Sequence, residues 1–267
     1  MYIHGIGIIS SVGRGLEAHR AALTNGQETK SSDGVHRVSE VALKDPALAK
    51  DARRAGRFDR MAILAGLDAL KDAGPQSTAH SSSIGLILAT GLGPHVTTFR
   101  FLDDMISFKE KDVSPTLFSH SVHNAAASYL SLLAGIRGPT LTVTRFSSAF
   151  QEALTLAQAW LEQKRCDYVL VGAVDELGSV MEEVLRFRAS GENIAFGEGS
   201  AFFVLSQHPS EKNYEAIESV QNATDITLSS DQLVLTERLF GRLPCQSAFR
   251  AAVAALLLSA PKTGGEI

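Results

Sequence analysis

The spacing of apolar residues along the chain predicts strands interleaved with helices. Short runs rich in β-branched residues are typical of strands, and apolar residues that recur every three or four positions are typical of helices. Strands are predicted at residues 2–9, 84–90, 140–145, 167–174 and 200–206. Helices are predicted at about 15–25, 57–73, 97–108, 122–134, 149–164, 178–187 and 247–259. This order predicts a layered α/β fold with helices on both faces of a sheet.

Residues 207–232 interrupt the pattern, because they are polar and contain no long apolar run. They predict a linker with short elements. We therefore expect a domain at residues 1–206, followed at residues 207–267 by the linker and a small C-terminal remnant.

Composition narrows the class of protein. Of its 267 residues, 45% are hydrophobic, and a net charge of −4 argues against a nucleic-acid partner. Cys166 and Cys245 fit a reducing compartment and provide no disulfide framework. The N-terminus lacks the positive region of a signal peptide, and the apolar run at residues 249–260 is too short to span a bilayer. We expect a cytoplasmic protein without membrane insertion.

The most informative stretch runs from Gly138 to Phe150. A Gly-Pro pair precedes a β-branched strand, a turn follows the strand, and a helix begins after the turn. Ser147 lies in this turn, at a helix N-terminus where free N–H groups favour negative charge. A strand–turn–helix corner of this kind is how a nucleophile elbow is built.

This stretch and its surroundings resemble the β-ketoacyl synthases of the thiolase superfamily. Segments that match in the same order are residues 2–10, 56–74, 84–93, 114–139, 167–176 and 196–205, the last with the family's Gly-Glu-Gly sequence. The resemblance implies a thiolase-like fold, with one intact half that has a five-stranded mixed sheet between helices. It implies a strongly reduced second half, since the chain is too short for a full one. Where the family has an acyl-accepting cysteine, this chain has Ser147.

Two interpretations of Ser147 are open, a nucleophile or a polar cap on the following helix. A helix N-terminus contributes only ~0.3–1 kcal/mol, which moves a pKa by less than about one unit. That cannot activate an alcohol, so serine needs an adjacent general base. On a weak alignment, Glu237 and Arg242 stand where the family has its lysine and a histidine, and Arg145 and Phe146 crowd the turn. We therefore predict no catalytic residue.

Other polar clusters favour structural roles. His120 and His123 have a spacing that could bind a metal on a helix, but no cysteine or carboxylate cluster accompanies them. The Gly-x-Gly sequences at residues 5–7, 91–93 and 197–199 complete neither a dinucleotide fingerprint nor a P-loop, and they are expected to permit close backbone approach. Asp175 and Glu176 could form an acid–base pair, but the resemblance implies a structural role. We predict no metal and no cofactor.

The resemblance also implies where a second subunit binds. In the family, the regions that match residues 97–108 and 114–129 lie near the subunit boundary and help to bound the acyl tunnel. Candidates for a tunnel gate are therefore Phe101, Leu102, Met105 and Leu117. A plain core helix is the alternative, because Phe101, Met105 and Phe108 recur at helical spacing. Interface candidates are His120, His123, Asn124, Tyr129, Thr142, Thr144 and Phe146.

The function implied is that of a chain-length factor, a ketosynthase-like subunit without a nucleophile. Such a subunit pairs with an active β-ketoacyl synthase, shapes the shared tunnel and meets acyl carrier protein through the complex. Typical chain-length factors have glutamine in place of the cysteine and keep two full halves. Ser147 and the short tail are closer to the abridged subunits of bacterial type II systems for aryl polyenes. Two alternatives stay open: a serine-dependent acyltransferase whose base comes from the partner, and a purely structural stabiliser.

Overall fold

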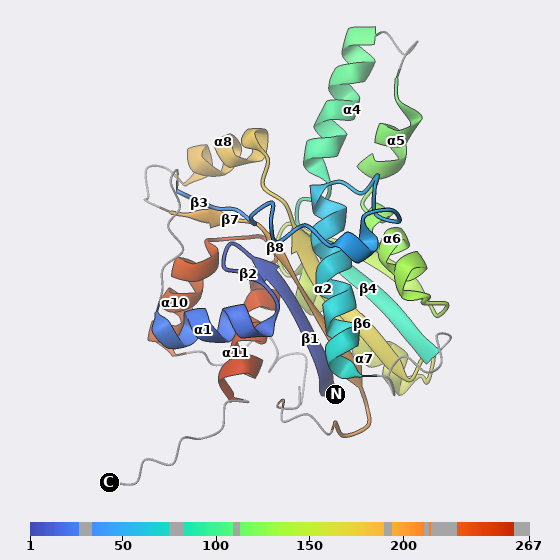
Figure 1. Cartoon of the computed structure of the whole chain (residues 1–267), viewed down its shortest axis with the longest axis vertical. Coiled ribbons are helices and arrows are strands. Elements are labelled where there is room, and N and C mark those ends of the chain that lie inside the picture. Colours follow the sequence, from blue (N-terminus) through green and yellow to red (C-terminus); the bar gives the residue numbers. More distant parts are fainter. Residues whose placement is uncertain are drawn as a thin grey trace.

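A mixed β-sheet forms the central layer of the protein (Figure 1). The computed structural model describes residues 1–26, 34–74, 83–108, 113–189, 194–210, 214 and 229–258. The strands are ordered β2-β1-β8-β6-β4-β5 across the sheet. Their bounds are β1 Tyr2–Ser10, β2 Gly13–Arg14, β4 Ile84–Thr90, β5 Thr140–Thr144, β6 Tyr168–Asp175 and β8 Gly199–Ser206. β4 runs parallel to β5 and β6, whereas β8 is antiparallel to β1 and β6.

Helices cover both faces of the sheet (Figure 1). The covering helices are α1 Leu16–Asn25, α2 Arg57–Ala73, α6 Ala125–Ala134, α7 Ala149–Glu162 and α11 Gln246–Leu258. α2 and α6 bury one apolar cluster, which includes Ile63 and Leu88, while α1, α7 and α11 bury another, which includes Phe150 and Phe203. The central strands β4, β6 and β8 are almost entirely buried and mostly apolar because both faces of the sheet are covered there. None of the described helices combines the length and apolarity needed to cross a membrane.

β1 and α2 approach so closely that only glycine fits between them. A Cβ atom on Gly5 would lie 2.3 Å from the carbonyl oxygen of Ala69, and one on Gly7 would lie 2.0 Å from that of Ala65. Contacts this short would force the strand and the helix apart. The prediction that this Gly-x-Gly sequence permits close backbone approach is confirmed.

The layered α/β prediction is confirmed, and the five predicted strands differ from the observed ones by at most one residue at either end. The sheet also contains β2, and β3 (Val35–His36) pairs with β7 (Phe196–Gly197) in a separate two-stranded sheet. These short strands were not predicted, because two residues carry no detectable period.

The helical regions differ from the prediction in two places. The helix expected at residues 122–134 is α6, which begins at Ala125, and α5 (Pro115–Ser121) was not predicted. Ser114 caps this separate helix, which begins with proline. The linker expected at residues 207–232 ends earlier, where α10 (Ser230–Phe240) begins. Ser229 and Gln232 form a capping box there. Both caps are visible in the sequence, as Ser-Pro and Ser-x-x-Gln.

α4 (His95–Phe108) and α5 project from the body of the protein, and we call this pair the α4–α5 arm (Figure 1). Phe101 of α4 packs against Phe118 of α5 with ring centres 5.5 Å apart. The core-helix interpretation of residues 97–108 is wrong for this chain, because only His95 of α4 is buried. Ile106, for example, is 79% exposed. α8 (Ser179–Arg188) likewise has no buried residue.

Candidate functional site

The turn between β5 and α7 has the strand–turn–helix geometry expected of the elbow. Ser147 lies in this turn and is exposed, and Ser148 occupies the N-cap position of α7 without a capping hydrogen bond from its side chain. Ser148 has φ 62° and ψ 13°, a left-handed conformation that costs a residue other than glycine about 1–2 kcal/mol. The sharp corner therefore depends on the backbone of Ser148, the residue after the family's nucleophile position.

Ser147 has no general base beside it in the described part of the chain. Its carbonyl oxygen accepts a hydrogen bond from the Ser148 hydroxyl at 2.6 Å, and no described side chain bonds to its own hydroxyl. Arg145 forms an ion pair with Glu152 in the first turn of α7, and Phe146 is 77% exposed. A paired guanidinium and a phenyl ring cannot deprotonate an alcohol.

Glu237 and Arg242, which align with the family's lysine and histidine, lie close to each other. The Glu237 carboxylate is 3.5 Å from the Arg242 guanidinium. Neither makes a polar contact with Ser147 within the described residues. Contact with the elbow helix is made by α11 instead, where the Ser247 hydroxyl donates a hydrogen bond to Gln151 at 3.2 Å. The tail therefore packs against the elbow helix without bringing a base to the turn.

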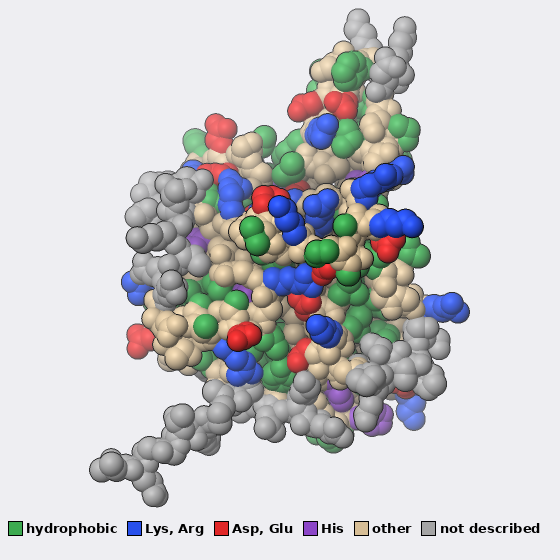
Figure 2. Space-filling model, in the orientation of Figure 1, with side chains coloured by type: hydrophobic (Ala, Val, Ile, Leu, Met, Phe, Trp, Pro, Cys, Tyr) green, Lys and Arg blue, Asp and Glu red, His purple; other side chains and the backbone are tan. Residues whose placement is uncertain are grey.

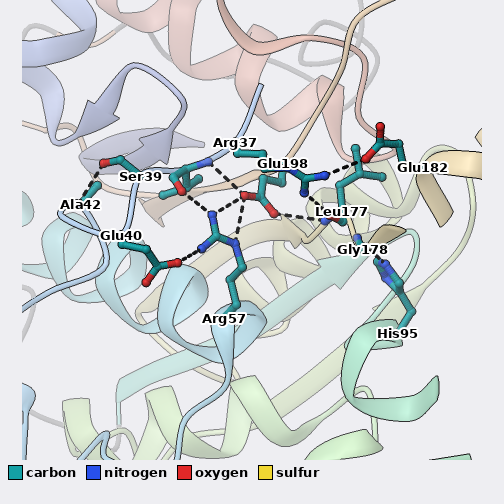
Figure 3. Close-up of polar contacts among 11 residues, drawn as sticks. Arg37, Ser39, Glu40, Ala42, Arg57, His95, Leu177, Gly178, Glu182 and Glu198 are labelled. Atoms are coloured by element: carbon teal, nitrogen blue, oxygen red, sulfur yellow. Dashed lines mark hydrogen bonds and ion pairs between the residues drawn. The ribbon is translucent and has the colours of Figure 1, made fainter. Parts of the chain in front are cut away.

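Glu198, the acid of the Gly-Glu-Gly sequence, is the centre of a buried polar network (Figure 3). Its carboxylate accepts hydrogen bonds from Arg57 Nε at 3.0 Å, the Val38 amide at 3.0 Å and the Leu177 amide at 3.2 Å. Arg57 begins α2 and Leu177 lies just before α8, so one carboxylate joins three separate segments. Removing one partner of a buried ion pair typically costs ~3–5 kcal/mol. This geometry supports a structural role.

Asp175 and Glu176 hold the loop that follows β4. Asp175 accepts hydrogen bonds from Thr90 Oγ1 and from the Leu92 amide, both at 2.8 Å. Glu176 accepts one from the Val96 amide, in the first turn of α4, at 3.1 Å. Burial raises the pKa of Asp175 to about 6 and that of Glu176 to about 7. Because these carboxyl groups are engaged by the loop and by α4, the geometry favours the structural interpretation.

His120 and His123 have different surroundings. His120 Nδ1 lies 3.1 Å from the Asp59 carboxylate, and the imidazole stacks on Tyr129. Burial raises the pKa of the Asp59 carboxyl. His123 is exposed, and its ring lies against Gly93. Within the described ranges, no three His, Cys, Asp or Glu side chains are grouped so that they could hold a metal ion.

β5 is an edge strand that pairs with β4. The Pro139 carbonyl and the Arg145 amide both bond to β4. Because alternate residues of a strand direct their backbone groups to the same side, the odd-numbered residues between these two also face β4. The even-numbered residues therefore direct their N–H and C=O groups away from the sheet. These residues are Thr140, Thr142 and Thr144.

A groove of about 550 Å³ runs between β5 and α6, beside this open edge. Leu132 of α6 and Leu141 of β5 line it and are 78% and 40% exposed. Asn124 also lines it, and Thr142 directs into it a buried hydroxyl without a described hydrogen-bond partner. An open strand edge with apolar neighbours is a template for pairing with another chain.

The four gate candidates all lie on the α4–α5 arm. Phe101, Met105 and Leu117 are half-buried, and Leu102 is 44% exposed. The arm brings these side chains onto one projecting element, outside the layers of the sheet (Figure 1). Whether they bound a tunnel depends on the partner subunit, so the gate stays a prediction.

The family model for the β-ketoacyl synthase N-terminal domain matches residues 17–191. The chain belongs to the β-ketoacyl synthase family. Its relatives include 3-oxoacyl-[acyl-carrier-protein] synthase 2 of Vibrio harveyi, 25% identical over 154 residues that cover 53% of this chain and 37% of the relative. The corresponding protein of Vibrio cholerae matches at the same identity and coverage. This chain therefore spans little more than a third of the curated relatives it matches.

Solved ketosynthase structures share the fold. The ishigamide ketosynthase/chain length factor has a TM-score of 0.67 and 22% identity, with 77% of this chain and 62% of that chain covered. The ketosynthase ApeO in complex with its chain length factor ApeC, from Xenorhabdus doucetiae, has a TM-score of 0.58 and 18% identity. The match covers 77% of this chain and 78% of that chain. The thiolase-like fold implied by the sequence is confirmed.

Sequence reasoning missed the polar partners that position the ketosynthase-like loops. Arg57 and Asp59 lie in the Gly56–Arg60 segment that carried part of the resemblance, but nothing there identifies Glu198 and His120 as their partners. These pairs are separated by 141 and 61 residues. The sequence does place two opposite charges, Arg57 and Asp59, at the start of an otherwise apolar helix. Because buried charges need partners, this pattern could have indicated that each has one elsewhere in the chain.

Proposed function

We propose that this chain is a non-catalytic, ketosynthase-like subunit of the chain-length-factor type, which pairs with an active β-ketoacyl synthase. The observation that carries the proposal is the elbow, which retains its shape but presents Ser147 without a general base in the described chain. Such an elbow can support the corner of a shared fold, but it lacks the means to accept an acyl group.

The surface around β5 supports pairing with a second, related subunit. The even-numbered residues of β5 offer backbone groups that point away from β4 and have no partner among the described residues, and Leu132 and Leu141 flank them. The α4–α5 arm adds further exposed apolar side chains, among them Ile106 and Phe118 at 79% and 58%. Apolar surface of this extent around an open edge favours a protein partner.

The subunit would shape or stabilise the partner's acyl tunnel during polyketide or fatty-acid-like synthesis in the cytoplasm. Acyl carrier protein would be met through the complex. One of the similar structures is a ketosynthase in complex with its chain length factor, from Xenorhabdus doucetiae, and this supports a subunit of the chain-length-factor type, which we assign to an aryl polyene system. One of the similar structures is a type II polyketide acyl-carrier protein in complex with its ketosynthase, and this supports the same class of system.

Co-purification from the native host tests the proposal. The expected result is a one-to-one complex of this chain with a full-length ketosynthase, identified by mass spectrometry and sized by light scattering. The complex should form β-ketoacyl products, whereas this chain alone should not. If this chain alone transfers acyl groups and its Ser147 becomes acylated, it is a serine acyltransferase and the proposal is wrong.

A further inference from the structure

A second cavity lies far from the elbow in the fold, between α2 and the segment that contains η1 (Pro46–Leu48). Its volume is about 350 Å³, within the range of small-molecule sites. Its floor consists of Leu43, Ile63 and Leu64, which are all at most 4% exposed. Leu48 adds a half-buried wall. The floor is therefore a dry apolar surface that belongs to the core on the α2 side of the sheet.

Three cations surround this apolar floor. Lys44, Arg53 and Arg60 all line the cavity, and none forms an ion pair with a carboxylate in the described part of the chain. Asp45 is the acidic lining residue, but Arg14 already binds it at 2.9 Å. Figure 2 shows Lys and Arg side chains gathered over this region of the surface. The cavity therefore carries uncompensated positive charge.

Arg60 is held in place while Lys44 and Arg53 are free to adjust. The Arg60 Nε donates a hydrogen bond to the Ala55 carbonyl at 3.0 Å, which fixes the guanidinium at the start of α2. Lys44 and Arg53 are exposed at the rim. One fixed and two adjustable donors can close around an oxyanion, for which guanidinium groups are well suited.

We propose that this cavity binds an aliphatic oxyanion, a molecule with an unbranched hydrocarbon chain that ends in a carboxylate or a phosphate. The chain lies on the Leu43, Ile63 and Leu64 floor, and the oxyanion lies between Arg53, Arg60 and Lys44. The site is separate from the elbow and from β5. Its test uses the complex of the proposed function, and if no complex forms, the full chain alone is titrated in the same way. An apolar floor alone would accept a neutral chain, and the three cations select the charged end.

Isothermal titration calorimetry on the complex with the ketosynthase tests the proposal, with the ketosynthase alone as the reference. Octanoate, kept below its micellar concentration, should bind at one additional site per copy of this chain. Each methylene removed should weaken binding about fourfold, so butyrate, which is four methylenes shorter, should bind about 250-fold more weakly. Octyl phosphate should also bind. Octanol and octylamine should bind at least tenfold more weakly than octanoate.

Variants locate the site. Arg53→Glu should weaken octanoate binding about three- to tenfold, because it replaces an attraction at the rim by a repulsion. Arg54→Glu is the matched control, since Arg54 is an exposed neighbour that does not line the cavity. Ala49→Phe should abolish binding by filling the cavity from its exposed rim, with an unchanged melting temperature.

Three results would overturn the proposal. The first is no octanoate binding beyond that of the ketosynthase. The second is equal binding of octanol and octanoate, which would make the cavity an unselective apolar surface. The third is octanoate affinity that neither Arg53→Glu nor Ala49→Phe changes. If octanoate does not bind but Arg53→Glu weakens capture of acyl carrier protein, the cations serve an acidic protein and the ligand site is rejected.

Discussion

Ser147 shows how one residue decides between an enzyme and a partner subunit. Because no described group can deprotonate its hydroxyl, Ser147→Ala should change condensation by the ketosynthase complex less than about fivefold. Intact-mass spectrometry should detect no acyl-serine in the parent. Acylated Ser147, or a loss of activity of several orders of magnitude in the variant, would instead support a serine acyltransferase whose base comes from the partner.

Glu176 makes stability depend on pH. Burial raises the pKa of its carboxyl from 4.5 to about 7, so the fold favours the neutral form. Its stabilising contribution is complete below pH 4.5 and is lost as the pH rises through 7. Between these values the free energy of unfolding should fall by up to about 1.4 kcal/mol per pH unit from this group. Urea denaturation at a series of pH values measures the slope.

Glu176→Gln supplies the comparison. Glutamine keeps an uncharged acceptor for the Val96 amide. The free energy of unfolding should therefore fall less steeply with rising pH, and the variant should be more stable than the parent at about pH 8. The gain should be at most about 3 kcal/mol. Glu183→Gln on the exposed side of α8 is the control and should leave the slope unchanged. An unchanged slope in Glu176→Gln would refute the assignment to Glu176.

At the scale of elements, the periodicity of apolar residues predicted the long elements that have a continuous apolar surface. The five main strands and α2 were predicted well because each buries a continuous set of apolar residues. α5 and α10 were missed because they are identified by their caps, Ser114 and Ser229, and not by an apolar face. The same reasoning failed for the arm in the opposite direction. α4 has helical apolar spacing, but among the described residues only its His95 is buried.

Substitutions on the α4–α5 arm distinguish a subunit that controls chain length from one that only stabilises its partner. If Phe101, Met105 or Leu117 caps a tunnel shared with the partner, its volume limits the growing chain. Pushing an acyl chain into a filled tunnel means overpacking, at a cost of roughly 1–3 kcal/mol, or about 5- to 150-fold in rate. Trimming the right side chain to Ala should lengthen the products measured by mass spectrometry, and Trp should shorten them.

Val41→Ala is the control for the gate variants, because Val41 is 77% exposed and lies outside the arm. It should leave the product length unchanged. The gate variants must also assemble with the ketosynthase, which gel filtration checks. If all of them assemble and give unchanged products, the subunit is a stabiliser and the gate prediction is wrong.

At the scale of the whole molecule, the fold and the candidate site differ in how far the sequence predicts them. The fold could be predicted because apolar clusters within this chain cover both faces of the central strands. The candidate site could be predicted only in part. The elbow is local, whereas the Arg57–Glu198 and Asp59–His120 pairs join distant segments, and β5 is an edge strand of the sheet. Contacts between residues that are far apart in the sequence, or that lie in different chains, leave no periodic pattern in a single sequence.

A substitution at the open edge of β5 tests whether the partner subunit pairs with this strand. The Thr142 amide points away from β4, so Thr142→Pro removes an outward donor without breaking the bonds that hold β5 in the sheet. A partner strand paired at this edge would lose a hydrogen bond and meet the proline ring, so affinity for the ketosynthase should fall at least tenfold by surface plasmon resonance.

The neighbouring substitution Leu141→Thr, which keeps the backbone donor of Thr142, should weaken binding less. Circular dichroism should show both variants folded. If Thr142→Pro is folded and binds the ketosynthase as tightly as the parent, the partner does not extend the sheet at β5.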